Sequence, residues 1–338
     1  MDNRYERQIL FNRIGDLGQS KMRNKHVLIV GAGALGSASA EALVRAGIGK
    51  LTIIDRDYVE WSNLQRQQLY CEEDAAQKMP KAIAAKNRLK RINSEAEIIG
   101  IVMDARSDNL DFIFQDIDVI VDGTDNFDIR FIMNDFSQKY GIPWIYGSCV
   151  GSFGACYTII PGKTPCLHCL FKKVPISMVT CDTAGIIGPA VQMVAAYQVT
   201  EALKVLVEDY SSLRKTFLSF DLWNNQHTSI TVDHAKMTNC DSCGESKTFP
   251  YLSFENQTKL EILCGRNTVQ IRPSNNVKLN LEEIDKLFLK HGKVERNPYL
   301  LSCQLKEYRF VVFKDGRVMI HGTNNIQEAK KIYHSLLG

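Results

Sequence analysis

The sequence lacks long hydrophobic runs, and this limits the classes of protein that it can encode. None of its apolar stretches approaches the ~20 residues that a helix needs to cross a bilayer. The N-terminal residues are charged and contain no apolar stretch followed by a small-residue cleavage site, so we expect no signal peptide. The sequence therefore favours a cytoplasmic location and no membrane partner.

A strong excess of one charge is also missing. The 338 residues include 41 Lys and Arg and 38 Asp and Glu, which gives a net charge of +3. This near balance predicts no nucleic-acid partner, because binding through bulk electrostatics requires a basic excess. The content of 45% hydrophobic and 23% charged residues excludes disordered, collagen-like and coiled-coil chains. The length predicts one large domain and one smaller domain.

Apolar runs alternate with amphipathic segments through the first part of the chain. We predict strands at residues 26–30, 50–54, 98–103, 119–122 and 143–146, and helices at 37–46, 81–92, 129–140 and after Pro189. This alternation predicts an α/β fold, with a Rossmann-like, open, mostly parallel sheet and helices on both faces.

The composition becomes polar between Ser242 and Phe254, where we place a domain boundary. The residues that follow predict a small α+β domain. It is expected to contain helices at 281–290 and 326–337, and a hairpin of strands 309–313 and 318–320 joined by an Asp-Gly turn.

Three glycines, Gly31, Gly33 and Gly36, form a G-x-G-x-x-G pattern that follows a predicted strand and opens a predicted helix. Such a turn lets the backbone approach a phosphate, and the helix N-terminus favours an anion. Asp55 ends the next strand, where an acidic side chain can accept hydrogen bonds from ribose. Alternatively, the glycines serve only helix–sheet packing. The motif alone indicates a dinucleotide, above all NAD.

Further polar residues follow the strands at the same edge of the predicted sheet. Asn63 and Arg66 come after the second strand, Asp125 follows the strand at 119–122, and Lys81 starts a helix. Two cations, an amide and a carboxylate suit a nucleoside triphosphate with Mg²⁺, which prefers carboxylate and phosphate oxygens. The alternative is that Arg66 and Lys81 are ordinary surface charges.

The ten cysteines include two C-x-x-C pairs, Cys166 with Cys169 and Cys240 with Cys243. A disulfide framework is not expected in a long chain of cytoplasmic character. Four thiolates suit tetrahedral Zn²⁺ with no open position, which is a structural zinc site. A redox dithiol is the alternative, although neither pair lies in a thioredoxin-like βαβ context.

Taken in order, these motifs resemble those of the ThiF/MoeB/HesA enzymes, the bacterial relatives of ubiquitin-activating enzymes. The resemblance rests on the glycine turn, Asp55, residues 62–67, 124–126, 180–181 and both cysteine pairs, and it covers roughly residues 4–245. It implies an adenylating domain at 1–248 and an accessory domain at 255–338 that is too short for a rhodanese domain.

The resemblance also implies an activity. Such enzymes use ATP to adenylate the C-terminal glycine of a ubiquitin-like sulfur carrier of the ThiS or MoaD type, and they release pyrophosphate. The product then accepts sulfur, from a donor such as a cysteine desulfurase, for thiamine-thiazole or molybdopterin biosynthesis. The residues at the implied ATP–Mg²⁺ site are Gly31, Gly33, Gly36, Asp55, Asn63, Arg66, Lys81, Asp125 and Asn126.

Two further residues acquire a role only through the resemblance. Arg7 corresponds to an arginine that reaches the active site of the neighbouring subunit, which implies a homodimer. Cys181 occupies the position of a loop cysteine that, in some members, links covalently to the carrier. The residues alone equally allow Cys181 to be a small buried hydrophobe.

Two other functions compete with this one. An NAD-dependent oxidoreductase accounts for the segment from Gly31 to Asp55 but leaves Arg66, Lys81 and the thiolates without a purpose. A non-catalytic scaffold that binds the carrier requires only the fold, and the complete set of charged residues argues against it.

Overall fold

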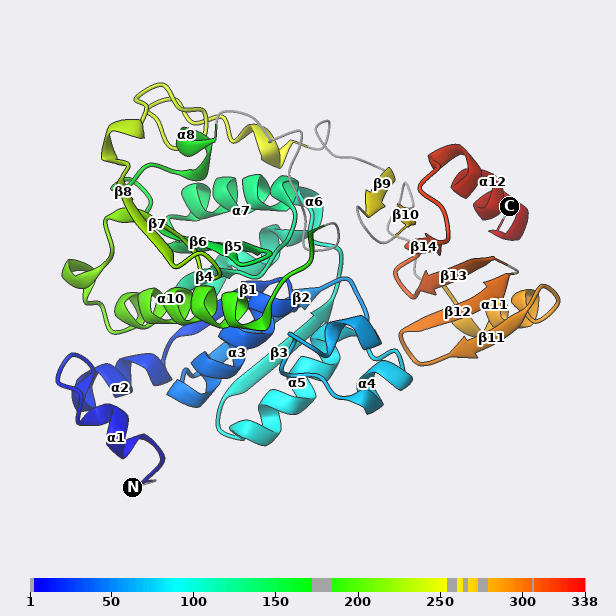
Figure 1. Cartoon of the computed structure of the whole chain (residues 1–338), viewed down its shortest axis with the longest axis horizontal. Helices are drawn as coiled ribbons and strands as arrows, with labels where there is room; N and C mark the ends of the chain where they lie inside the picture. The colour runs from blue at the N-terminus through cyan, green and yellow to red at the C-terminus, as the bar shows by residue number, and fades with distance from the viewer. Residues whose placement is uncertain are drawn as a thin grey trace. The chain divides into compact units, whose positions relative to one another are not determined.

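A computed structural model describes residues 3–171, 184–253, 260–263, 267–272, 279–305 and 307–337. The described residues form two compact units, the first comprising residues 3–171 and 185–253 and the second the described residues from 260 onward (Figure 1). Each unit has a sheet and a hydrophobic core of its own. In the described part of the chain, no helix has the length and apolar character needed to cross a membrane.

The first unit is built on an eight-stranded sheet with the order β3-β2-β1-β4-β5-β6-β7-β8. The first five strands are parallel: β1 (His26–Val30), β2 (Lys50–Asp55), β3 (Glu97–Val102), β4 (Val119–Asp122) and β5 (Trp144–Val150). Three antiparallel strands complete the sheet: β6 (Phe153–Ile159), β7 (Thr216–Asp221) and β8 (Gln226–Thr231). The expected mostly parallel α/β sheet is confirmed, and the antiparallel strands were not predicted.

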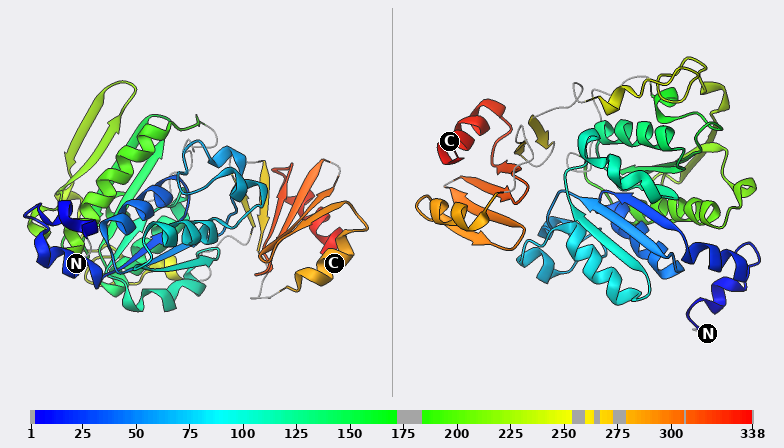
Figure 2. Two further views of the ribbon diagram at one scale, coloured as in Figure 1. Left: turned by 90° about the horizontal axis from the view of Figure 1, so that it is seen from below. Right: turned by 180° about the vertical axis from the view of Figure 1, so that it is seen from behind.

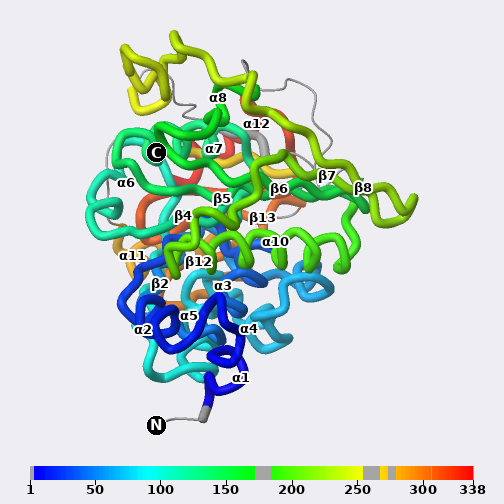
Figure 3. Tube along the Cα trace, turned by 90° about the vertical axis from the view of Figure 1, so that its left-hand side faces the viewer, coloured from blue at the N-terminus to red at the C-terminus, as the bar shows by residue number. Residues whose placement is uncertain are grey.

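Helices cover both faces of this sheet. One core cluster joins the strands to α3 (Ala34–Ala46), α5 (Lys81–Ile92) and α10 (Gly188–Leu206), and α10 packs beside α3 (Figures 1 and 3). On the other face, a second cluster joins the strands to α7 (Phe127–Tyr140). The short helices are α1 (Glu6–Ile9), α2 (Gly15–Arg23), α4 (Glu72–Ala76), α6 (Ser107–Leu110) and α8 (Leu167–Leu170).

The helix starts differ from the predictions for local reasons. Helix α3 begins at Ala34, directly after Gly33, so the whole glycine pattern lies at its N-terminus. Helix α7 begins at Phe127 because the Asn126 side chain accepts a hydrogen bond from the Asp128 amide and caps it. Helix α10 begins before Pro189, which lies in its first turn, where the missing N–H of proline costs nothing.

The second unit is an antiparallel sheet of six strands with the order β11-β12-β13-β14-β10-β9. The strands are β9 (Leu260–Leu263), β10 (Thr268–Ile271), β11 (Lys293–Arg296), β12 (Leu300–Leu305), β13 (Tyr308–Phe313) and β14 (Val318–His321). Helices α11 (Leu281–Phe288) and α12 (Ile326–Leu337) contribute to its core. The predicted hairpin is present as β13 and β14, and Gly316 has a φ of +87° in its turn.

The two outer strands of the large sheet are β3 and β8, and in the described part of the chain β8 pairs only with β7 (Figure 2). All six residues of β8 are exposed. This strand therefore lacks the alternation of buried and exposed side chains from which a strand is usually predicted.

Candidate nucleotide site and four-cysteine cluster

The glycine turn is shaped by contacts that exclude side chains. Gly31 has a φ of +91°, and a Cβ atom there would lie 2.4 Å from the carbonyl oxygen of Gly123. A Cβ atom on Gly36 would lie 1.8 Å from the Gly31 carbonyl oxygen. Close packing therefore requires glycine at both positions. Because Gly33 precedes α3 and has no side chain, no side-chain cap occupies the N-terminus of this helix.

The side chain of Asp55 binds the backbone of the glycine turn. Its carboxylate accepts hydrogen bonds from the Ala32 amide at 2.6 Å and from the Asp57 amide at 2.6 Å. Burial raises the pKa of Asp55, and the nearby Lys81 ammonium opposes this effect. Asp55 therefore has a structural task at the turn in addition to any role toward ribose.

Lys81 lies in the interior of the protein. It is 2% exposed, and its Nζ lies 3.4 Å from Oδ2 of Asp57. Its backbone amide, at the start of α5, donates to the Asp57 carbonyl at 2.9 Å. A buried ammonium requires an anion nearby, so the interpretation of Lys81 as a surface charge is wrong.

Asn63 and Arg66 lie together in the turn after β2. Asn63 is buried, and its Oδ1 accepts a hydrogen bond from the Glu60 amide at 3.0 Å. Arg66 is partly buried, and its Nη1 donates to the Ser62 carbonyl at 2.8 Å. The Arg66 amide donates to the Asn63 carbonyl at 3.1 Å, so the two predicted residues share one turn of chain.

Asp125 is exposed and lies in the loop between β4 and α7. This loop touches the glycine turn, because the Gly123 carbonyl lies against Gly31. The structure therefore brings the glycine turn, Asp55, Lys81 and the loop of Asp125 and Asn126 to one edge of the sheet. Arg7 is exposed on α1, and Cys181 lies outside the described residues.

Arg130 is a residue of this edge that the sequence analysis missed. Its guanidinium donates to Oδ2 of Asp122 at 2.9 Å, and to the carbonyls of Thr124 at 2.7 Å and Gly147 at 2.9 Å. Arg130 follows Asn126 by one helical turn, so its side chain lies near the start of α7. This spacing from the predicted helix start places Arg130 near the loop of Asp125, but it does not indicate that the side chain is buried.

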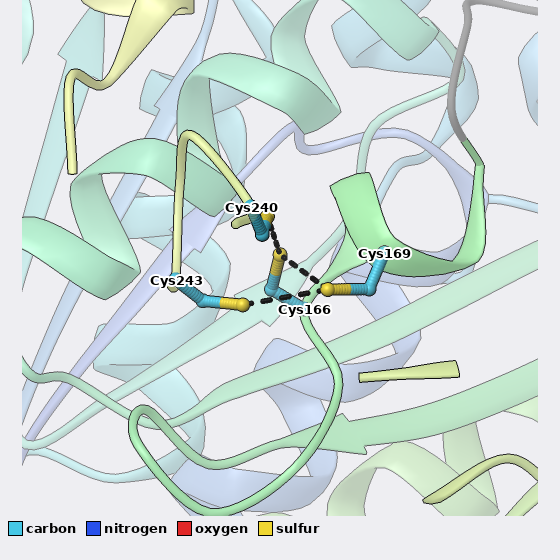
Figure 4. A group of neighbouring side chains, drawn as sticks. All are labelled: Cys166, Cys169, Cys240 and Cys243. Carbon is cyan, nitrogen blue, oxygen red and sulfur yellow. Dashed lines mark hydrogen bonds between the residues drawn. The ribbon is translucent and has the colours of Figure 1, made fainter. Parts of the chain in front are cut away.

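The four predicted cysteines converge on one buried point (Figure 4). The Sγ atom of Cys166 lies 3.8 Å from that of Cys169 and 3.6 Å from that of Cys240, and the Sγ atoms of Cys169 and Cys243 are 3.4 Å apart. None of the four forms a disulfide. Sulfur atoms bound to tetrahedral Zn²⁺ at about 2.3 Å are separated by about 3.8 Å, so the arrangement fits such an ion.

The protonation of these thiols also fits a cation. The hydrogen bond between the sulfur atoms of Cys166 and Cys169 raises the pKa of Cys166 and lowers the pKa of Cys169 to about 6. Adjacent thiolates repel one another, so four buried thiols in contact cannot all be ionised without a counter-charge. A divalent cation removes that conflict by neutralising two of the charges.

Two adjacent residues of helix α7 accept hydrogen bonds from the segments that carry the cysteines. Oδ1 of Asn134 accepts a hydrogen bond from the Leu167 amide at 2.7 Å, within the first cysteine pair. Asp135 accepts hydrogen bonds from the Ser242 hydroxyl at 2.5 Å, within the second pair, and from the Tyr251 amide at 2.9 Å. His168 Nδ1 lies 3.9 Å from the Cys240 sulfur, beside the cluster.

The fold and these two sites define an α/β protein with a candidate nucleotide site and a four-cysteine cluster. The chain belongs to the ThiF family, whose profile matches residues 5–242. It is 52% identical, over all of both chains, to the sulfur carrier protein ThiS adenylyltransferase of Bacillus subtilis. The SAMP-activating enzyme E1 of Haloferax volcanii is 33% identical over 72% of this chain and 89% of its own length.

Solved structures agree with this fold. Escherichia coli MccB, determined with ATP, superposes with a TM-score of 0.62 at 23% identity, over 72% of this chain and 75% of that chain. The complex of MccB with MccA-N7isoASN has a TM-score of 0.64 at 23% identity, over 72% and 76% of the two chains. At this identity the likeness establishes the fold.

Proposed function

We propose that the protein adenylates the C-terminal glycine of a ubiquitin-like sulfur carrier, with ATP as the nucleotide donor and pyrophosphate as the leaving group. The observation that carries this proposal is the 52% identity with the Bacillus subtilis ThiS adenylyltransferase over the full length of both chains. Because the identity extends over the C-terminal unit, we assign the carrier to the ThiS type and the pathway to thiamine-thiazole biosynthesis.

The reaction needs charge neutralisation more than proton transfer. The carrier's carboxylate attacks the α-phosphorus of ATP, a new C–O–P linkage forms, and the bond to pyrophosphate breaks. The attacking group is already an anion near neutral pH, so it requires no general base. The residues must therefore hold two anions together, which is catalysis by positioning and electrostatic stabilisation.

The charged residues at the edge of the sheet suit this task. Lys81 is a buried cation near the glycine turn, and Arg66 presents a guanidinium from the adjacent turn. We assign the phosphates to the N-terminus of α3, where Gly33 leaves the helix without a side-chain cap. Asp125 is the residue that would hold Mg²⁺, and a bound Mg²⁺ would supply positive charge to the phosphates.

The remaining residues complete the proposal. Arg7 is exposed on α1, and we assign it to the active site of a second subunit, so that the enzyme acts as a homodimer. The four cysteines hold a structural Zn²⁺ that ties the end of the first unit to α7. We assign the supply of sulfur to a cysteine desulfurase. We also assign to Cys181 a covalent link to the carrier.

Carrier-dependent exchange between ATP and pyrophosphate tests the function. We expect exchange with a ThiS-type carrier and much weaker exchange with a MoaD-type carrier. Equal or stronger exchange with the MoaD-type carrier would move the enzyme to molybdopterin biosynthesis. If neither carrier supports exchange, adenylation is wrong, and binding of NAD without ATP would then favour an oxidoreductase.

A further inference from the structure

Both peptide groups of Ala32, in the middle of the glycine turn, are held by side chains. Its N–H donates to the Asp55 carboxylate at 2.6 Å, and its carbonyl accepts a hydrogen bond from the Tyr70 hydroxyl, also at 2.6 Å. Tyr70 precedes α4 and lies 38 residues further along the chain. The turn is therefore oriented by residues that are not part of the glycine pattern.

Tyr70 is suited to a fixed hydrogen bond. Its side chain is buried, and its ring packs in the core cluster that α3 and α5 share. The Lys81 carbonyl, at 3.3 Å, is the weaker of the two acceptors near its hydroxyl. Burial raises the pKa of Tyr70 well above its ordinary value, so the hydroxyl keeps its proton and remains a donor.

The carbonyl of Ala32 and the N–H of Gly33 belong to the same peptide group. No described peptide bond is cis, and in a trans peptide these two groups point in opposite directions. A hydrogen bond that fixes the carbonyl therefore also fixes the direction of the Gly33 N–H. Within the described part of the chain, this N–H donates to no protein acceptor.

We propose that Tyr70 is a positioning residue for the nucleotide phosphates, because its hydroxyl orients the Ala32–Gly33 peptide so that the Gly33 amide faces the phosphate site at the start of α3. This inference rests on the proposed function, which places the phosphates at that turn. Tyr70 touches the turn through its hydroxyl and acts on the phosphates through that turn.

The test compares ATP with adenosine, which lacks phosphates, as ligands of the full-length protein. Tyr70→Phe removes one hydroxyl and keeps the ring that packs in the core. It is expected to raise the Kd for ATP about 2- to 13-fold, the range that the loss of one hydrogen bond gives. The Kd for adenosine is expected to change less than about twofold, because only the phosphates meet the reoriented amide.

Tyr157→Phe is the matched control, because Tyr157 is also buried but lies on β6, in the other core cluster. It is expected to leave both Kd values unchanged. The inference is overturned if Tyr70→Phe leaves ATP binding unchanged, or if it weakens adenosine binding as much as ATP binding. If the unsubstituted protein fails to bind ATP, the proposed function itself is wrong.

Discussion

Arg130 and Asp122 form a buried ion pair in which Nε donates to Oδ2 over 2.9 Å, at the point where β4 leads into α7. Burial opposes the charge on Arg130, but Asp122 and its neighbours outweigh this effect and raise the pKa of the guanidinium. The pair holds the loop that carries Asp125, because Arg130 also donates to the Thr124 carbonyl.

Replacing Arg130 is expected to destabilise the protein. Arg130→Met leaves the buried Asp122 carboxylate without its cation, which typically costs ~3–5 kcal/mol of unfolding free energy. Urea unfolding measures this loss. The control is Arg45→Met, which breaks an exposed pair with Glu41 on α3 and is expected to cost no more than about 0.5 kcal/mol. Similar losses for both variants would contradict the role of burial.

Asp125→Ala is expected to abolish carrier-dependent pyrophosphate exchange, because it removes the carboxylate assigned to Mg²⁺. Asp125 is exposed, so the unfolding midpoint and zinc content are expected to stay unchanged. Asp128→Ala removes another exposed carboxylate, in the first turn of α7, and is expected to retain most of the exchange activity. Normal exchange by Asp125→Ala would refute its assignment.

The dimer can be tested by mixing two inactive variants. If Arg7 acts in the partner's site, a heterodimer of Arg7→Ala and Asp125→Ala subunits contains one complete site. Random reassociation makes half of the dimers mixed, so the activity is expected to reach about a quarter of that of the unsubstituted enzyme. Co-purified mixed dimers without any recovered exchange would show that Arg7 does not act across subunits.

The cysteine cluster is expected to bind one zinc ion per chain, measurable by elemental analysis of protein purified without chelators. Cys240→Ser removes one ligand and is expected to lower both zinc content and thermal stability, because metal binding to such sites contributes several kcal/mol to folding. Cys71→Ser, at an exposed cysteine outside the cluster, is the control and should keep the zinc. A folded preparation without metal would reject the assignment.

Asp221, at the end of β7, is expected to contribute stability that depends on pH. Hydrogen bonds from the Ser152 hydroxyl at 2.6 Å and from the Asn224 side chain at 2.6 Å lower the pKa of Asp221. A lowered pKa means that the contribution is present above the unfolded-state value of about 4, and is lost as the pH falls through the folded-state pKa.

The difference in thermal midpoint between the unsubstituted protein and Asp221→Asn measures this contribution. It is expected to be constant from pH 8 down to about 5, and to shrink below about 4 as the carboxylate is protonated. A difference that persists unchanged at pH 3 would mean that the charge of Asp221 is not the cause.

Several parts of the structure follow from local sequence patterns. The parallel strands and the helices between them have the periodicity and the apolar runs of a doubly wound sheet. Helix α12 and the β13–β14 hairpin have equally clear signals. Strands β6 and β7 were not predicted either. Strand β8 could not be recognised in the same way, because all of its residues are exposed and it is stabilised by pairing with β7 and not by a pattern of its own.

The burial of charged residues was the least predictable property. Lys81 and Arg130 have the sequence character of surface cations, yet both are almost completely buried. Burial depends on which carboxylates the fold brings within reach, and Asp57 and Asp122 come from segments outside the helices that carry the two cations. A pattern within one helix contains no information about such a partner.

The amino-acid sequence by itself determined the alternation of elements and the place of the glycine turn, because these depend on residues that are close together in the chain. It also determined the membership of the ThiF family, because several such local motifs occur in a characteristic order over residues 5–242. Only the tertiary structure showed that Tyr70 holds Ala32 and that Arg130 is buried beside Asp122, and it placed the predicted partners Cys166 and Cys240 in contact across 74 residues. The contacts of Cys166 with Cys240 and of Tyr70 with Ala32 join segments that are 74 and 38 residues apart in the chain, and such contacts form only when the fold brings both segments together.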